Sequence, residues 1–403
     1  MNLSLTAPTA RLQRAPRFWT LPPLSLYIHI PWCVRKCPYC DFNSHESTGE
    51  IPDDRYIEAL IADLDQALPL IWGRRVYTIF FGGGTPSLLS AKAIESVLSA
   101  VRARVPLAVD AEITLEANPG TFESEKFAAY RAAGVNRLSI GIQSFNARHL
   151  TALGRIHDDA QAYRAIEIAR EHFDNFNLDL MYALPGQTLA EAQSDIDTAI
   201  ALHPPHLSVY HLTLEPNTYF HRYPPAVPDD DTAAEMQDAI AVKLRDSAYD
   251  HYETSAYAQR RLRSRHNLNY WTFGDYLGIG AGAHSKLSLP DRVLRQVRYR
   301  QPREYMARSL GGSAVQSDQP VAANEITFEF MMNALRLNDG FRTTLFEERT
   351  GMPLVMALPG LDEAERRGLI ARDHEHIAPT ELGRRFLNDL LQIFLPDPPV
   401  AST

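Results

Sequence analysis

All three cysteines of this 403-residue chain lie in one short segment, as Cys33, Cys37 and Cys40. Cysteines this close together do not build a disulfide framework, and the chain has no fourth cysteine to complete a four-thiolate zinc or iron–sulfur site. Three thiolates can instead hold three irons of a 4Fe–4S cluster and leave the fourth iron free to bind a reactant. The spacing C-x3-C-x2-C therefore predicts a cluster with one open iron.

Two other interpretations of these cysteines are a zinc site completed by His29 or His45, and three buried structural thiols. Buried structural cysteines would be scattered among core positions, whereas these occupy a loop-like segment with Pro38 inside it. Arg35 and Lys36 lie between the first two cysteines and are expected to lower the thiol pKa values, which favours metal ligation. The cluster remains the favoured interpretation.

Polar residues and glycines recur where strands are predicted to end. Apolar, β-branched runs alternate with amphipathic helical patterns, which predicts six parallel strands at Leu24–Ile30, Val76–Phe81, Glu112–Glu116, Arg137–Ile142, Asn177–Met181 and Leu207–Thr213. The cysteines follow the first strand, a glycine run over 82–84 follows the second, Glu116 and Gln143 end the next two, and Asp179 lies in the fifth. A β/α barrel carries its chemistry at these strand ends, so the pattern predicts one shared site.

Supporting elements can be placed from the same patterns. Between the first two strands, Asp54 is expected to cap a helix whose apolar residues recur every three and four positions. Further along, helix patterns cover 326–337, 343–350 and 361–367, followed by a hairpin over 369–377 and a last helix over 380–395. Helices followed by a hairpin predict a small, mainly helical domain of winged-helix-like shape.

Composition sets the class of protein. With 45% hydrophobic and 22% charged residues and no run of eighteen apolar residues, the sequence predicts a soluble, cytoplasmic protein without a membrane span. The net charge of −9, and an excess of acids over bases in the C-terminal segment, argue against nucleic-acid binding.

The predicted fold class is α/β, a partial (β/α)6 TIM-like barrel with the helical domain attached. We expect a flexible leader over 1–23, a barrel core over 24–255, an extension and turn-rich linker over 256–324, the C-terminal domain over 325–395 and a tail over 396–403.

A family resemblance covers nearly the whole chain, from Leu24 to Leu395. It rests on the segments PPLSLYIHIPWCVRKCPYCDFNSH, FGGGTPSLLS, EITLEANPG, NRLSIGIQSF, LGRIH, FNLDLMYALPGQT and HNLNYW. The cysteine spacing alone resembles the radical S-adenosylmethionine (SAM) superfamily. The full set resembles its oxygen-independent coproporphyrinogen III oxidase-like proteins, and among them the haem chaperone branch.

The resemblance implies roles for individual residues. The open iron of a cluster held by Cys33, Cys37 and Cys40 would bind the amino and carboxylate groups of SAM. Arg155, with its planar guanidinium, would suit a carboxylate partner. The complete set that the resemblance places around SAM is Tyr27, Tyr39, Gly83, Gly84, Thr85, Glu116, Gln143, Arg155 and Asp179.

The segment HNLNYW, which begins at His266, resembles the HNxxYW signature of the haem-binding branch. An imidazole can ligate haem iron, and a neighbouring Tyr and Trp can stack on a flat macrocycle. His266 is therefore a candidate axial ligand. His284, in the glycine-rich segment GAGAHSK, is a competing candidate, and the sequence leaves the choice open.

Two departures bear on function. The oxidases of this family carry a fourth cysteine two positions after the last cluster ligand, where this chain has Phe42, and their segment before the cysteines is longer. The resemblance therefore implies a chaperone that carries haem to apo-haemoproteins such as respiratory proteins, in some cases at the membrane, with a homodimer as a further expectation. Oxidative decarboxylation of coproporphyrinogen III is the alternative.

Overall fold

The computed structural model describes residues 15–47, 49, 51–120, 123–259 and 261–396. All six predicted parallel strands are present and are hydrogen-bonded in chain order. They are β1 (Leu24–Ile30), β4 (Val76–Gly83), β5 (Leu107–Ala117), β6 (Arg137–Gln143), β7 (Phe176–Tyr182) and β8 (His206–His211). The predicted α/β architecture is confirmed. Because the six strands are parallel, their carboxyl ends lie on the same side of the barrel.

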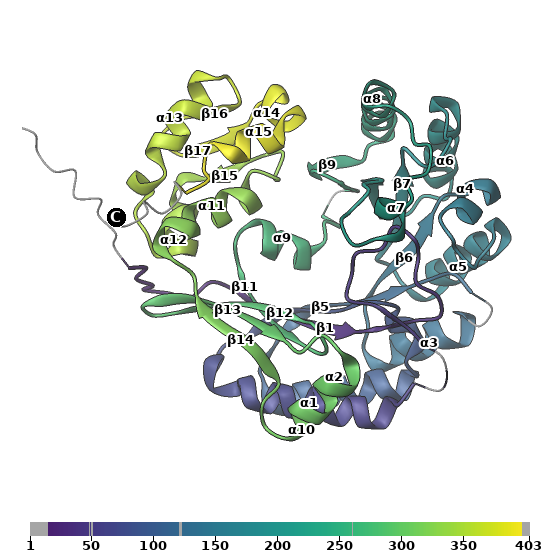
Figure 1. The fold of residues 1–403 in the computed structure, drawn as a ribbon, viewed down its shortest axis with the longest axis horizontal. Coiled ribbons are helices and arrows are strands. Elements are labelled where there is room, and N and C mark those ends of the chain that lie inside the picture. Colours follow the sequence, from purple (N-terminus) through teal and green to yellow (C-terminus); the bar gives the residue numbers. More distant parts are fainter. Residues whose placement is uncertain (1–14, 48, 50, 121–122, 260, 397–403) are drawn as a thin grey trace, which may run out of the picture.

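Helices link the strands and cover the sheet, with α1 and α2 on the side opposite to α9 (Figure 1). These connections are α1 (Asp53–Ala67), α2 (Ala91–Arg104), α3 (Glu123–Ala133), α4 (Ala147–Ala152), α5 (Asp159–His172) and α6 (Leu189–Ala201). The expected cap of the first helix is wrong, because Pro52 occupies the cap position and Asp54 lies in the first turn. In the first turn, the Asp54 carboxylate stabilises the helix by its attraction to the positive end of the helix dipole.

The sheet continues beyond the barrel at both edges, giving twelve strands in the order β14-β13-β12-β11-β1-β4-β5-β6-β7-β8-β10-β9. At one edge β11 (Asp275–Ile279) runs parallel to β1, and β12 (His284–Leu289), β13 (Arg292–Arg298) and β14 (Val315–Pro320) follow antiparallel. At the other edge lie β10 (Ala256–Ala258) and β9 (Asp250–Glu253).

Residues 292–324, the last part of the extension and linker expected over 256–324, form regular structure. They form β13, β14 and α10 (Pro302–Leu310), which packs on α1. The polar composition that suggested a linker belongs to β14, an edge strand whose side chains are mostly exposed. Polar side chains are typical of an edge that must not pair with other chains.

The C-terminal part contains α11 (Ala323–Ala334), α12 (Thr343–Thr350), α13 (Leu358–Arg366) and a three-stranded sheet of β15 (Phe341–Arg342), β17 (His376–Pro379) and β16 (Ile370–Arg372). Phe330 lies at its centre, with ring centroids 5.0 Å from Phe346 and 5.1 Å from Phe341. The single last helix that we expected is two, α14 (Glu381–Arg385) and α15 (Leu387–Gln392), because Phe386 between them leaves the helical conformation.

The expected leader and tail fall partly on residues 1–14 and 397–403, which lie outside the described residues. Residues 15–23 are described, and three backbone hydrogen bonds hold them. Arg17 N donates to Gly351 O at 2.9 Å, Phe18 N donates to Pro290 O at 3.0 Å, and Pro23 O accepts from Asp275 N at 2.9 Å. Among the described residues, no helix is both long and apolar enough to cross a membrane.

Candidate cofactor site

The three cysteines line one cavity of about 720 Å³ at the carboxyl ends of the barrel strands. Cys33 ends β2 (Trp32–Cys33), a short strand paired with β3 (His45–Glu46) just after β1. Cys37 and Cys40 follow in a turn closed by a bond from Cys40 N to Cys37 O of 3.2 Å. The segment between β1 and α1 therefore presents three free thiols to the same space.

Two of the thiols, those of Cys33 and Cys40, have raised pKa values. Burial raises the pKa of Cys33, and the nearby Cys40 and Cys37 raise it further against a hydrogen bond from Thr85. Burial also raises the pKa of Cys40, where Lys36 has only a minor opposing effect. The expected lowering by Arg35 and Lys36 is therefore wrong for these two thiols, since loss of solvation outweighs a charge at the surface.

The glycine run brings the end of β4 against the cysteine strand. Gly84 N donates to Ile30 O and Thr85 N to Trp32 O, both at 2.7 Å. A Cβ at Gly84 would lie 2.4 Å from Trp32 O and 3.0 Å from the Cys33 sulfur, and Gly83 has a φ of +117°. Gly84 must be glycine because of this close approach, and Gly83 because of its positive φ. The contact between the end of β4 and Cys33 therefore requires glycine at both positions.

Two half-buried carboxyl groups line the same cavity as the cysteines. Glu116 Oε2 accepts from Gly83 N at 3.1 Å, and burial, then the charge of Asp179, raises the pKa of Glu116 to about 8. Asp179 accepts from Ser139 Oγ at 2.9 Å and Asn177 Nδ2 at 2.8 Å, and burial raises its pKa as well. A cationic ligand between these acids would restore their ionised forms.

Arg155 ties together three parts of the site. Its Nη2 donates to Asn118 Oδ1 and to Gly141 O, both at 2.7 Å, and its Nη1 lies 3.7 Å from the Cys37 sulfur. Asn118 in turn donates to Thr85 Oγ1 at 3.0 Å. Asn118 was not predicted from the sequence, although it lies two residues after Glu116 and just past the end of β5.

The remaining predicted residues are divided. Gln143, which ends β6 with a φ of +69°, and Tyr39 both line the cavity. Tyr27 does not line it: its ring lies beside Phe80, with centroids 6.2 Å apart, and its hydroxyl lies 3.1 Å from His29 Nδ1. The structure thus brings together every predicted SAM-contact residue except Tyr27.

His266 lies apart from the cavity, on α9 (Arg265–Trp271), and only 1% of its surface is exposed. Its Nδ1 is 2.7 Å from Thr78 Oγ1 and its Nε2 is 3.1 Å from Tyr270 Oη, so both ring nitrogens have partners. Burial lowers the pKa of His266 to about 3. The ring as placed is a buried structural group, whereas the competing His284 is exposed at the start of β12.

The three thiols are soft donors of the kind that an iron–sulfur cluster takes. Within the described ranges, no group of three or more His, Cys, Asp or Glu side chains is arranged to hold a metal ion. His29, one of the proposed fourth ligands, already uses Nε2 on Asn43 O at 2.9 Å. Three free thiols line one cavity, and Gly84 packs against one of them, Cys33. This arrangement fits the three thiolate ligands of a 4Fe–4S cluster.

Comparison with known proteins gives the family. Residues 27–199 match the radical SAM superfamily, and residues 321–386 match the HemN C-terminal domain. The heme chaperone HemW of Escherichia coli K12 is 51% identical over 93% of this chain and 99% of its own length, and that of Haemophilus influenzae is 46% identical over 93% and 98%. In fold, the E. coli coproporphyrinogen III oxidase HemN aligns with a TM-score of 0.79 over 93% of this chain and 90% of its own, at 24% identity. The chain belongs to the HemW family of radical SAM proteins.

Proposed function

We propose that this protein is a haem chaperone that binds haem and passes it to apo-haemoproteins. Relatives covering nearly its whole length carry the name heme chaperone. The supporting observation in the molecule itself is the cavity that gathers three free thiols and two half-buried carboxyl groups. Soft sulfur donors suit iron, and half-buried acids suit a cationic ligand.

In this proposal Cys33, Cys37 and Cys40 hold a 4Fe–4S cluster whose open iron takes the amino acid part of SAM. Such a cluster, when bound, supplies an electron for reductive cleavage of SAM. Glu116 and Asp179 stabilise the positive charge of the ligand, and Arg155 orients the Cys37 thiol and Asn118. Gly83, Gly84, Thr85, Gln143 and Tyr39 shape the wall of the cavity, and Tyr27 supports it through His29.

Phe42 favours haem handling over coproporphyrinogen oxidation. Its side chain lines the same cavity and is 63% exposed, at the position where the oxidase branch carries a cysteine. A phenyl ring supplies neither a thiol hydrogen nor a redox step. The same exposed ring adds an apolar surface at the mouth of the site.

The organisation of the chain and its partners belong to the proposal. A radical SAM core spans 24–255, the HNxxYW-containing extension spans 256–324 and the C-terminal domain spans 325–395. The recipients are respiratory haemoproteins, and the protein meets membranes through them. It works in the cytoplasm, as a monomer or a homodimer. His266 as the haem ligand stays a prediction, and its two occupied nitrogens disfavour it.

An anaerobic experiment tests the function. The cluster is reconstituted, SAM and a reductant are added, and two assays run in parallel: consumption of coproporphyrinogen III, and a stoichiometric haem Soret band that moves to an apo-haemoprotein. We expect haem uptake and transfer without coproporphyrinogen consumption. Turnover of coproporphyrinogen without haem uptake would overturn the proposal. Phe42→Ala is the matched variant. It removes the ring without supplying a thiol, so we expect that it does not consume coproporphyrinogen III either.

A further inference from the structure

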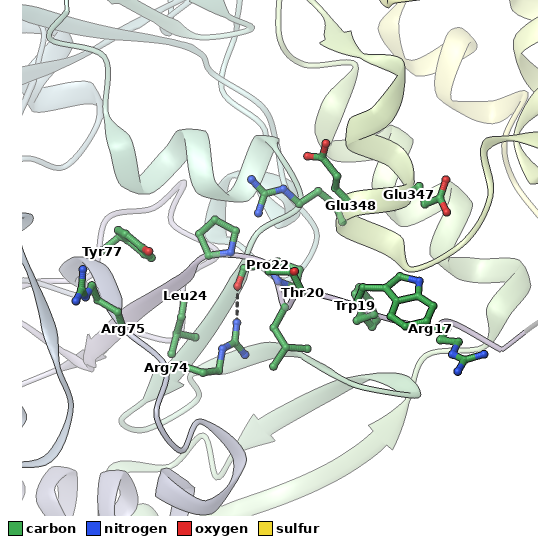
Figure 2. Close-up of a pocket in the computed structure, with 14 residues that line it drawn as sticks. Arg17, Trp19, Thr20, Pro22, Leu24, Arg74, Arg75, Tyr77, Glu347 and Glu348 are labelled. Atoms are coloured by element: carbon green, nitrogen blue, oxygen red, sulfur yellow. Dashed lines mark hydrogen bonds between the residues drawn. The ribbon is translucent and has the colours of Figure 1, made fainter.

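A second cavity of about 720 Å³ lies at the other end of the barrel, where β1 and β4 begin (Figure 2). Its wall combines residues 17–24, the turn before β4, and α12 of the C-terminal part. We call it the arginine cavity, after the four arginines that line it: Arg17, Arg74, Arg75 and Arg349. Its lining acids are Glu347 and Glu348, both exposed, so the lining has a net positive charge.

Arg74 carries a buried donor without a partner. Its side chain is only 10% exposed, and its Nη2 is used twice, 2.6 Å from Pro22 O (Figure 2) and 2.8 Å from Asp275 Oδ2. Its Nη1 is buried and no protein group accepts from it. Leaving a charged donor buried and unpaired is costly, so such a group points to an acceptor supplied from outside the chain.

Arg349 of α12 shows the same pattern as Arg74. It lies in the last turn of α12, and its Nε is also buried without a partner. Burial lowers the pKa of Arg349, and the charge of Glu348 offsets this only in part. Two arginines from distant parts of the sequence thus line one cavity, and each carries a nitrogen that no protein group pairs with. Guanidinium groups placed in this way suit a carboxylate or phosphate.

The cavity also has an aromatic wall. Trp19 is 85% exposed, with the Arg17 guanidinium 5.0 Å from its ring centroid, and Tyr77 is 41% exposed. Figure 2 shows Trp19 and Tyr77 at opposite ends of the cavity. Exposed indole and phenol faces are costly in water and favour a flat apolar ligand.

We propose that the arginine cavity is a second ligand site for a planar organic anion. The anion's carboxylate or phosphate groups pair with Arg74 and Arg349, and its flat body covers Trp19. A cavity of this size is within the range of small-molecule sites. Haem, with two carboxylates on a flat ring, has this chemistry and so does a nucleotide; the assignment to haem rests on the proposed function.

The test uses the full chain and two probes, metal-free protoporphyrin IX and ATP, titrated by quenching of protein fluorescence. Arg349→Gln removes one cation of the cavity and leaves the buried ion pair between Arg74 and Asp275 intact. Trp19→Ala removes the exposed indole ring. Trp72→Ala, equally exposed at 83% but outside the cavity, and Arg245→Gln on α8 (Asp230–Asp246) are matched controls. We expect one probe to lose affinity about tenfold or more in Arg349→Gln and to bind the controls as it binds the wild type.

The two probes separate the sources of the anion. Loss of protoporphyrin binding in the cavity variants, with weak binding of its dimethyl ester to the wild type, identifies a porphyrin carboxylate; the same loss for ATP identifies a phosphate. Wild-type affinity of both probes in Arg349→Gln and Trp19→Ala, or no binding to the wild type, overturns the inference. Haem transfer is measured on the same samples. Haem transfer in all variants beside unchanged probe affinity refutes only this site. Absence of haem transfer by the wild type, beside probe binding that depends on the cavity residues, refutes only the proposed function.

Discussion

At the scale of single residues, Glu116 and Asp179 bring two carboxyl groups with raised pKa values into the cavity that the cysteines line. They could be chosen from the sequence because a carboxyl group within an apolar strand is costly unless it has a task. Their partners could not, because the contact between Asp179 and Ser139 on β6 depends on which residues of two strands face each other. The burial that raises the Glu116 pKa likewise follows from the packed barrel, since nothing local in LEANPG encodes it.

Glu116→Gln is expected to remove a pH dependence of stability. The folded-state pKa of about 8 is above the unfolded value, so the folded protein binds an extra proton and its stability falls as pH rises through that range. From pH 5 to pH 8 this amounts to roughly 2 to 4 kcal/mol. Denaturant unfolding of the metal-free protein at both pH values should show the fall in the wild type and a smaller one in Glu116→Gln.

The control for this prediction is Glu58→Gln, an exposed position on α1. It should keep the wild-type dependence on pH. An equal fall in stability for Glu116→Gln and the wild type would contradict a half-buried, protonated Glu116.

At the scale of elements, strands were easier to predict than the loops between them. The apolar run Leu24–Ile30 matches β1 at both ends, because a strand buried on both faces reads as a continuous apolar segment. The cysteine segment after it has no such periodicity. Its shape comes from distant contacts, above all Asn43, whose Nδ2 donates to Ala281 O and Arg300 O, both at 2.9 Å.

Asn43→Ala is expected to loosen the cysteine segment while leaving the fold intact. The change removes two hydrogen bonds to residues far along the chain and should cost about 1 to 2 kcal/mol of stability. A reconstituted cluster should then lose its absorbance several-fold faster under a chelator. Ser47→Ala is the control, since Ser47 Oγ donates only to the nearby Gly49 O at 2.7 Å. Equal rates of cluster loss in the two variants would show that Asn43 does not position the cysteines.

His266→Ala is expected to weaken the fold. The ring joins α9 to β4 through Thr78, and it stacks on Phe80 with centroids 4.9 Å apart. Its loss leaves a cavity and removes the hydrogen-bond partner of the Tyr270 hydroxyl. We expect a loss of about 2 to 4 kcal/mol in denaturant unfolding and a much smaller effect for the exposed His284→Ala. Unchanged stability together with a lost haem Soret band would instead return His266 to the role of haem ligand.

At the scale of the whole molecule, a buried polar network joins the barrel to its added strands. Asp63 of α1 lies 3.2 Å from Arg298 Nε of β13, both side chains being 1% exposed, and accepts from Tyr305 Oη of α10 at 2.9 Å. It also accepts from Gly280 N at 3.2 Å, beside the carbonyl that holds Asn43. The sequence could not predict this network, because Asp63 lies more than two hundred residues from its partners. In the sequence, Asp63 and Arg298 each read as an ordinary surface charge.

Breaking the network at Arg298 should therefore affect both stability and the cysteine site. Arg298→Met leaves Asp63 buried without its cation, and we expect a loss of about 3 to 5 kcal/mol in denaturant unfolding. Adding Asp63→Asn removes the uncompensated charge, so the double variant should recover part of that loss, and the coupling energy follows from the double-mutant cycle. The exposed pair Arg385 and Asp238, 2.8 Å apart, gives the control cycle, where only a small coupling is expected.

Additive effects of Arg298→Met and Asp63→Asn on stability would contradict an energetic coupling between these two residues. Faster cluster loss in Arg298→Met than in the double variant would show that the charge left on Asp63 disturbs the segment that Asn43 ties to the cysteines.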